Sequence, residues 1–220
     1  MPVQKNMLIR SFIARKKELS LWMLFSMLLI LVFGKIQASE EPSFSEPTPR
    51  SKNTKPLNSS LSIGARPGPY SFLIATGPDR GKQTCYICET GDDPGIIVFT
   101  RKLNQPVAKV LSSIDQFISK ESKTPDKQVA RSWLTVLGEK TVVLDALTTW
   151  AKEQGLKKIP VGIFDDADGP PAYKIKPEAE LTILLFKQKK VMANFSYRAG
   201  EFSDKELSVI GAACKKLIAP

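Results

Sequence analysis

Short apolar runs alternate with amphipathic segments from residue 70 onward, and this alternation restricts the fold more than any other feature. The run "IIVFT", residues 96–100, is rich in β-branched side chains and fits a buried strand. The next segment has the i, i+3, i+4, i+7 spacing of a helix with one apolar face, at Val107, Val110, Leu111, Ile114, Phe117 and Ile118. Strands alternating with helices predict an α/β sandwich, a mixed sheet covered on both faces.

The remaining segments extend this pattern. Further strands are predicted over residues 70–75, 132–138 and 159–164, and residues 181–186 and 191–197 flank the charged turn "KQKK" as a hairpin. A second helix, expected to end near Gly155, is marked by Val143, Ala146, Leu147 and Trp150. The last helix is predicted to begin at Ser203, which forms a capping box with Glu206. We expect Trp133, Tyr173 and Cys214 to be core residues.

The net charge does not indicate a nucleic-acid-binding protein. The chain has 32 Lys and Arg residues and 22 Asp and Glu residues, a formal charge of +10. Residues 1–38 hold six of the basic residues and one acidic residue, so residues 39–220 retain 26 and 21, about +5. These charges are scattered and are not interleaved with aromatic side chains, as a base-stacking surface would require. We therefore expect no nucleic-acid partner.

The chain contains no histidine. This absence excludes Ser-His-Asp and Cys-His nucleophile systems, His-ligated metals and haem attachment at a C-x-x-C-H motif. The sequence therefore predicts no resident cofactor and no metal site built on histidine.

The N-terminus has the pattern of an export signal. A basic stretch ends in "ARKKELS", and in the following 13 residues, 21–33, only Ser26 is polar. This run is shorter than the roughly 20 residues of a membrane-spanning helix but fits the apolar core of a signal peptide. Ala38 before Ser39 provides a cleavage site. Residues 1–38 are interpreted as a signal peptide, or as an uncleaved signal anchor, and we expect no other membrane contact.

Residues 39–69 are predicted to be a linker. They contain six prolines and seven serines and have little apolar periodicity, which is typical of a flexible or extended segment. The folded domain is accordingly placed at residues 70–220. The protein is expected outside the cytoplasm, as a periplasmic, secreted or outward-facing membrane-anchored protein.

Cys85 and Cys88 form a C-x-x-C motif ahead of the strand at residues 96–100. The glycines and proline of "GDDPG", which follows, predict that no helix comes directly after the motif. Export favours a disulfide between the two cysteines. Such a bond closes a very short loop and stabilises the fold little, whereas short, exposed disulfides are readily reduced. Three interpretations stay open: a redox pair, an inert structural disulfide and a Cu(I) site with two thiolate ligands.

Charged residues surround the motif in the sequence. Arg80 and Lys82 would lower the pKa of a cysteine, whereas Glu89 and the two aspartates after it would raise it. Because Cys85 is the cysteine closer to Lys82, we expect Cys85 to be the more reactive sulfur.

The predicted order of elements, ending in a hairpin and a helix, resembles the thioredoxin-like fold. Residues 159–195 are similar to its redoxin (peroxiredoxin-like) branch, in which a strand leads into an Asp/Gly turn, an Ala-Tyr pair with an aliphatic residue, and a hairpin. The counterparts here are residues 165–169, 172–175 and 181–195. The resemblance covers about residues 70–217 and implies a mixed sheet sandwiched by helices.

The chain departs from this family at two positions. The family's reactive cysteine follows the first central strand at the start of the next helix, and the corresponding residues 100–107 contain no cysteine. The proline that the family places before the hairpin strand corresponds to Leu181. A peroxidase that uses the family's usual cysteine is therefore not expected.

These features predict an exported thioredoxin-fold protein in which Cys85 and Cys88 form a redox-active disulfide. Its expected partners are client proteins that carry thiols or disulfides. The alternative is a redox-inert binding module of the same fold with a structural disulfide.

We predict that the mature chain begins near Ser39 and lies outside the cytoplasm, because the apolar run is short and ends at small residues. N-terminal sequencing of protein from the native host tests this expectation. An intact Met1 on a membrane-bound product would instead establish a signal anchor.

Overall fold

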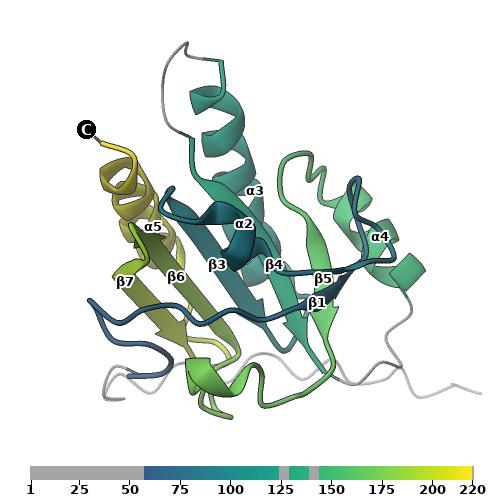
Figure 1. Ribbon diagram of the computed structural model, residues 1–220, viewed down its shortest axis with the longest axis horizontal. Helices are drawn as coiled ribbons and strands as arrows, with labels where there is room; N and C mark the ends of the chain where they lie inside the picture. The colour runs from purple at the N-terminus through teal and green to yellow at the C-terminus, as the bar shows by residue number, and fades with distance from the viewer. Residues whose placement is uncertain (1–56, 124–128, 139–143, 220) are drawn as a thin grey trace, which may run out of the picture. The chain divides into compact units, whose positions relative to one another are not determined.

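A seven-stranded mixed sheet forms the centre of the structure (Figure 1). The computed structural model describes residues 57–123, 129–138 and 144–219, so the predicted export signal lies outside the described residues. Across the sheet the strands follow the order β2, β1, β5, β4, β3, β6, β7. Their bounds are β1 Phe72–Ile74, β2 Gln83–Thr84, β3 Gly95–Thr100, β4 Arg131–Leu137, β5 Val161–Phe164, β6 Leu181–Lys187 and β7 Lys190–Tyr197.

Strand β3 lies inside the sheet, parallel to β4 and antiparallel to β6. All six of its residues are buried, as expected for a strand that is covered on both faces. Its side chains alternate between two cores, so that Ile96 and Val98 face one and Ile97 and Phe99 face the other. The prediction of a buried strand here is confirmed. The other predicted strands and the hairpin are present too, whereas β2 was not predicted.

The three long helices in the described part of the chain all cover one face of the sheet. They are α3 Gln105–Glu121, α4 Leu144–Glu153 and α5 Asp204–Leu217, and their apolar side chains share one core with Ile96 and Val98. The predicted capping box of the last helix is present, because the backbone N–H of Ser203 donates to the Glu206 carboxylate over 3.0 Å. None of the described helices is long and apolar enough to cross a membrane.

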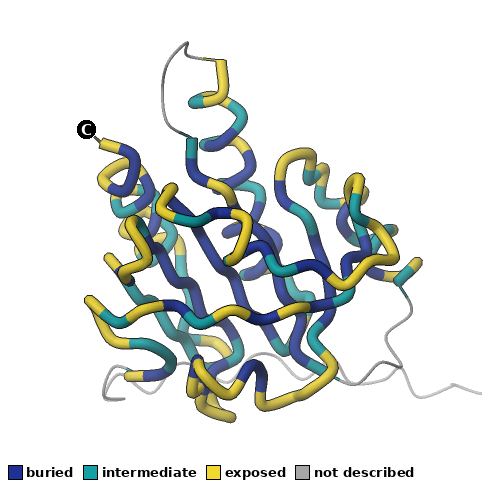
Figure 2. The backbone as a smooth tube through the Cα atoms, viewed as in Figure 1, coloured by how far each residue is buried: buried dark blue, intermediate teal, exposed yellow. Residues whose placement is uncertain are grey.

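Of the described residues, those on the opposite face form only short elements. These are α2 Tyr86–Thr90, the 3₁₀ turn η1 Pro171–Tyr173 and the extended segment at residues 57–71 (Figures 1 and 2). The predicted mixed sheet with helices is present, although the helices on this second face are short. Strands β3, β4 and β5 are parallel and follow one another across the sheet in one direction, so right-handed crossovers place α3 and α4 on the same face.

The domain begins earlier than Tyr70, because residues 57–69 of the predicted linker lie against the sheet. Asn194 donates from its side-chain amide to the carbonyls of Ser59 and Leu61, over 2.7 Å each. The Gly64 N–H donates to Val191 and the Val191 N–H donates to Ala65. Leu57 and Leu61 also pack on the core of this face. These contacts offset the ordering entropy that the proline- and serine-rich composition alone would not.

A group of buried aromatic rings fills the core of the α2 face. Trp133 and Tyr173, both predicted to be core residues, are fully buried. The Tyr70 hydroxyl accepts a hydrogen bond from the Trp133 indole N–H over 2.8 Å and shares another with Thr135 Oγ1 over 2.8 Å. Burial raises the pKa of Tyr70 far above its usual range, so its hydroxyl stays neutral.

Replacing Tyr70 by Phe should lower the free energy of unfolding by about 1–3 kcal/mol, because it leaves the buried Trp133 N–H without an acceptor. Urea unfolding of both proteins measures the difference. Tyr197→Phe is a matched control, since the half-buried Tyr197 hydroxyl has no hydrogen-bond partner among the described residues, and its effect should stay within about 0.5 kcal/mol. Equal effects of the two substitutions would contradict this role for the Tyr70 hydroxyl.

Candidate functional site

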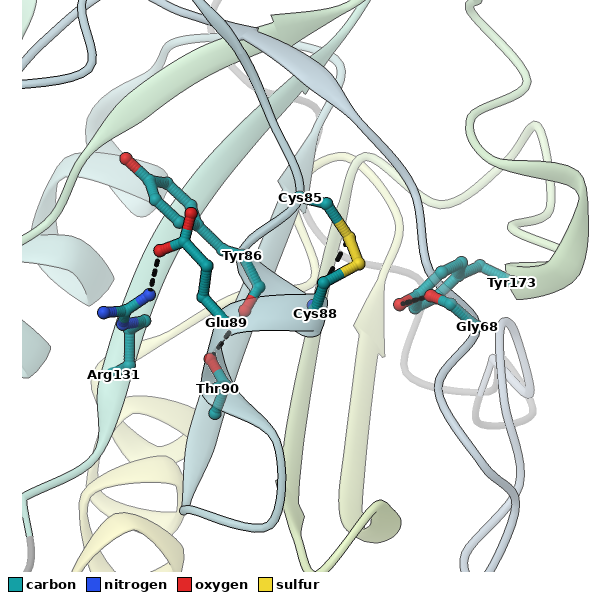
Figure 3. The surroundings of a disulfide bond; sticks show 8 residues. All are labelled: Gly68, Cys85, Tyr86, Cys88, Glu89, Thr90, Arg131 and Tyr173. Carbon is teal, nitrogen blue, oxygen red and sulfur yellow. Dashed lines mark hydrogen bonds and ion pairs between the residues drawn. A yellow bond between two sulfur atoms is a disulfide. The ribbon is translucent and has the colours of Figure 1, made fainter.

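Cys85 and Cys88 are joined by a disulfide (Figure 3). Their sulfur atoms are 2.06 Å apart and their Cα atoms 5.4 Å apart. The Cys88 backbone N–H donates to Cys85 Sγ over 3.3 Å and to the Cys85 carbonyl over 3.0 Å. The pair thus lies in one tight turn at the start of α2.

Helix α2 begins inside the C-x-x-C motif, with Cys85 as its N-cap. The glycine that was expected to prevent a helix after the motif does end this one, because the helix stops before Gly91, whose φ is 57°. The five-residue helix that contains the motif was not predicted. Tyr86 and Thr90 are buried one turn apart, and the Thr90 hydroxyl donates to the Tyr86 carbonyl over 2.7 Å. A single turn anchored by two residues is too short to show helical periodicity in the sequence.

The two cysteines differ in exposure. Cys88 is exposed, whereas Cys85 is half-buried. The sequence led us to expect Cys85 as the more reactive sulfur, and the structure instead makes Cys88 the residue that is more open to an incoming molecule. Cys88 also lines a cleft of about 300 Å³, together with Arg66, Pro67, Pro69, Ile87, Gly91, Phe186 and Lys189.

The cations that line the cleft are not those suggested by the sequence. Arg80 forms an ion pair with Asp145 of α4, and Lys82 lies 3.4 Å from Asp79. The two cations that line the Cys88 cleft are instead Arg66, from the predicted linker, and Lys189, from the β6–β7 turn. Sequence reasoning missed both, because they lie far from the motif along the chain and only the fold brings them to it.

Ion pairs also occupy the acidic residues around α2. Glu89 pairs with Arg131 of β4 (Figure 3), and Asp92 lies 3.3 Å from the Lys189 ammonium group. The negative charges that would oppose a cysteine thiolate are thus partly balanced by cations from other elements.

The edge where the thioredoxin-like family carries its reactive cysteine has a different set of side chains. The loop after β3 leads to Asn104, which caps α3 by accepting a hydrogen bond from the Val107 N–H over 3.3 Å. The Arg101 guanidinium donates to the carbonyls of Ala167, Lys176 and Ala179. The loop contains no thiol, and its guanidinium is held by three carbonyl groups.

The disulfide lies toward the other end of β3. Phe186, which lines the Cys88 cleft, pairs with Gly95, the first residue of that strand. The strand is six residues long, so at about 3.3 Å per residue its ends lie about 17 Å apart. The cysteine pair and the family's usual position therefore belong to opposite ends of the same strand.

Cys214 is remote from the pair. It is buried on α5, in the core that the long helices form, whereas Tyr86 of the motif packs in the core on the other face of the sheet. Burial raises the pKa of the Cys214 thiol to about 12. The prediction of a core cysteine is confirmed, and the sheet separates Cys214 from Cys85 and Cys88.

Within the described residues, no three His, Cys, Asp or Glu side chains gather in a way that could hold a metal ion. The two sulfur atoms are bonded to each other in this structure, and a Cu(I) site would require them as free thiolates.

No protein-family model and no curated protein matches the chain. Solved structures do resemble it. A proposed protein disulfide isomerase from Bacteroides thetaiotaomicron is 15% identical, with a TM-score of 0.56 over 73% of this chain and 92% of that one. A proposed thiol:disulfide interchange protein DsbE from Chlorobium tepidum is 14% identical, with a TM-score of 0.53 over 73% and 100% of the chains.

Peroxidoxin BcpB from Mycobacterium tuberculosis is also similar, at 14% identity and a TM-score of 0.51 over 73% of this chain and 99% of that one. These likenesses show that the domain has the thioredoxin-like fold, as the sequence resemblance implied. They include proteins of the redoxin branch.

Cys214→Ala should lower the free energy of unfolding by about 1 kcal/mol or more, as a core truncation does, and leave the disulfide unchanged. The unfolded thiol ionises near pH 9, whereas burial keeps the folded one protonated to about pH 12. The wild type should therefore lose stability relative to Cys214→Ala as the pH rises above 9. Urea unfolding at several pH values measures this difference. Rapid alkylation of Cys214 in the native protein would contradict its burial.

Proposed function

We propose that the disulfide between Cys85 and Cys88 is a thiol–disulfide exchange centre on an exported thioredoxin-like domain. The observation that carries this proposal is the exposure of Cys88 beside a cleft, as part of a disulfide that is already formed. Exposed disulfides with an open approach are the ones that exchange with thiols.

The exchange proceeds by two displacements at sulfur. A thiolate of a reduced donor attacks Cys88 Sγ, the bond to Cys85 breaks, and Cys85 leaves as a thiolate while donor and Cys88 form a mixed disulfide. A second thiolate of the donor then attacks the donor sulfur and releases Cys88 as a thiolate. Two electrons pass to the protein and the donor becomes a disulfide. The Cys88 N–H, which already donates to Cys85 Sγ, favours the departing thiolate.

A purely structural role gains little support from the surrounding contacts. The disulfide joins residues only three apart, so it removes little entropy from the unfolded chain. The same turn is already held by the buried side chains of Tyr86 and Thr90. Tyr86 packs against Phe72 and Trp133, with ring centroids 5.7 Å away in each case. The bond is therefore dispensable for placing α2, which leaves it free to open and close.

Export completes the proposal. The signal peptide proposed at residues 1–38 would deliver the chain to a compartment where disulfides persist. Disulfide-bearing or thiol-bearing proteins in that compartment are the proposed clients. Two of the proteins with a similar fold carry names of disulfide isomerase and thiol:disulfide interchange proteins, which supports this class of chemistry.

The second candidate is a redox-inert binding module. It is favoured by one observation, namely that the family's usual reactive edge has no thiol and that Arg101 there donates to three backbone carbonyls. In that case the disulfide would persist whatever thiols are present.

Single-cysteine variants separate the two candidates. Cys85→Ser leaves the exposed Cys88 thiol, which should be trapped as a mixed disulfide with a client or a small thiol. Cys88→Ser leaves the half-buried Cys85 thiol, which should be trapped several-fold more slowly. Mass spectrometry of both variants, purified from an oxidising compartment, measures the adducts. If neither variant carries an adduct, and if the wild-type disulfide resists dithiothreitol in native buffer, the protein is an inert binding module.

A further inference from the structure

We propose that the cleft beside Cys88 selects small thiols that carry a carboxylate. This inference rests on the proposed exchange function and adds the substrate class to it. The cleft of about 300 Å³ is lined by one sulfur residue, two cations and four apolar side chains, and it is lined by no acidic residue. The lining residues are Cys88, Arg66, Lys189, Pro67, Pro69, Ile87, Gly91 and Phe186.

The charge of the cleft comes mainly from Arg66. Its side chain is exposed and has no ion pair or hydrogen bond among the described residues. Lys189 contributes a second cation, although its ammonium group lies 3.3 Å from Asp92, which offsets part of its charge. An anion next to Cys88 would therefore meet one free guanidinium, which can bind a carboxylate through two parallel hydrogen bonds.

The segment that carries Arg66, residues 64–69, is held by hydrogen bonds on both sides of Arg66. On one side the backbone of residues 64 and 65 forms two hydrogen bonds with Val191, over 2.8 and 2.9 Å. On the other side the Tyr173 hydroxyl donates to the Gly68 carbonyl over 2.8 Å (Figure 3). Pro67 and Pro69 fix two φ angles between and beside these anchors. Arg66 therefore projects from a backbone that is ordered before a ligand arrives, which reduces the entropy cost of binding.

The size and lining of the cleft indicate the rest of the substrate. A volume of about 300 Å³ is at the lower end of the range for small-molecule sites. Ile87 and Phe186 provide apolar contact, and the approach to Cys88 requires a free thiol. A low-molecular-weight thiol with an aliphatic body and a carboxylate combines these features.

Reduction of the native disulfide by three small thiols of different charge tests the inference. Mercaptoacetate carries a negative charge, 2-mercaptoethanol none and cysteamine a positive charge. Each rate constant is taken per thiolate and divided by the rate constant of the same thiol with an uncharged small-molecule disulfide, so that neither the ionisation nor the intrinsic nucleophilicity of the thiol enters the comparison. On this normalised scale, mercaptoacetate should react about tenfold faster than cysteamine at low salt. This mercaptoacetate-to-cysteamine rate ratio should shrink towards one at about 1 M salt.

Charge variants locate the effect. Arg66→Gln should reduce the ratio about threefold, and Lys189→Gln should reduce it less, because Asp92 already offsets Lys189. Asp92→Asn, which frees Lys189, should increase the ratio. Lys190→Gln is the matched control, since Lys190, the exposed first residue of β7, is the neighbour of Lys189 and does not line the cleft. It should leave the ratio within about 1.5-fold of the wild type, because its charge is solvated.

The outcomes separate this inference from the proposed function. If all three thiols reduce the disulfide at the same normalised rate, or if Arg66→Gln and Lys190→Gln act equally, the cleft does not select carboxylates and the exchange function stands. If no thiol reduces the native disulfide, the exchange function fails and the inference fails with it.

Discussion

Neither face of strand β3 is in contact with water. Its six residues are buried between the core of the long helices and the core of the aromatic rings. All six are paired with β4 on one side and with β6 on the other. Gly95 at its start cannot carry a side chain, because a Cβ atom there would overlap the ring of Phe186. With the strand so constrained, only the segments that enter and leave it can vary in chemistry.

The two ends of β3 carry different polar groups. At the carboxyl end, Arg101 and Asn104 make hydrogen bonds with backbone groups and with Glu180, so the usual location of a thioredoxin-like active site contains a satisfied polar network. Toward the amino end, α2 brings an exposed cysteine next to the turn of the β6–β7 hairpin and the segment around Arg66. The thiol chemistry that we propose therefore uses the family's scaffold at the opposite end of its central strand.

Periodicity predicted the elements with extended apolar faces and missed those held by a few contacts. Residues 96–100 and the helix beginning near Pro106 could be predicted, because their apolar side chains repeat over several turns or pleats. Helix α2 is one turn long and depends on Tyr86 reaching the core beside Phe72 and Trp133. That contact is between residues distant in sequence, so no local pattern indicates it.

The same limit applies to the candidate site. The cysteine pair could be recognised from the spacing of the motif, and its disulfide was expected from the predicted export. The more exposed cysteine and the cations beside it depend on tertiary structure. Residues 57–69 have a linker's composition, yet Leu57 and Leu61 reach the core and the backbone around them bonds to Val191 and Asn194. Arg66 is placed at the cleft by these contacts. The position of the long helices on one face likewise depends on the order of the strands across the sheet. The order of elements along the chain does not determine it.

Native-state reduction of the disulfide, followed in sub-denaturing urea, tests most directly whether Cys85 and Cys88 form an exchange centre. The protein is treated with a dithiol, the reaction is quenched with an alkylating reagent, and the labelled cysteines are identified by mass spectrometry. We predict that exactly the two cysteines of the motif are labelled, that Cys214 is not, and that the rate is proportional to dithiol concentration and nearly independent of urea. A rate that rises steeply with urea and appears together with labelling of Cys214 would show that the bond opens only when the domain unfolds, which would contradict a redox function.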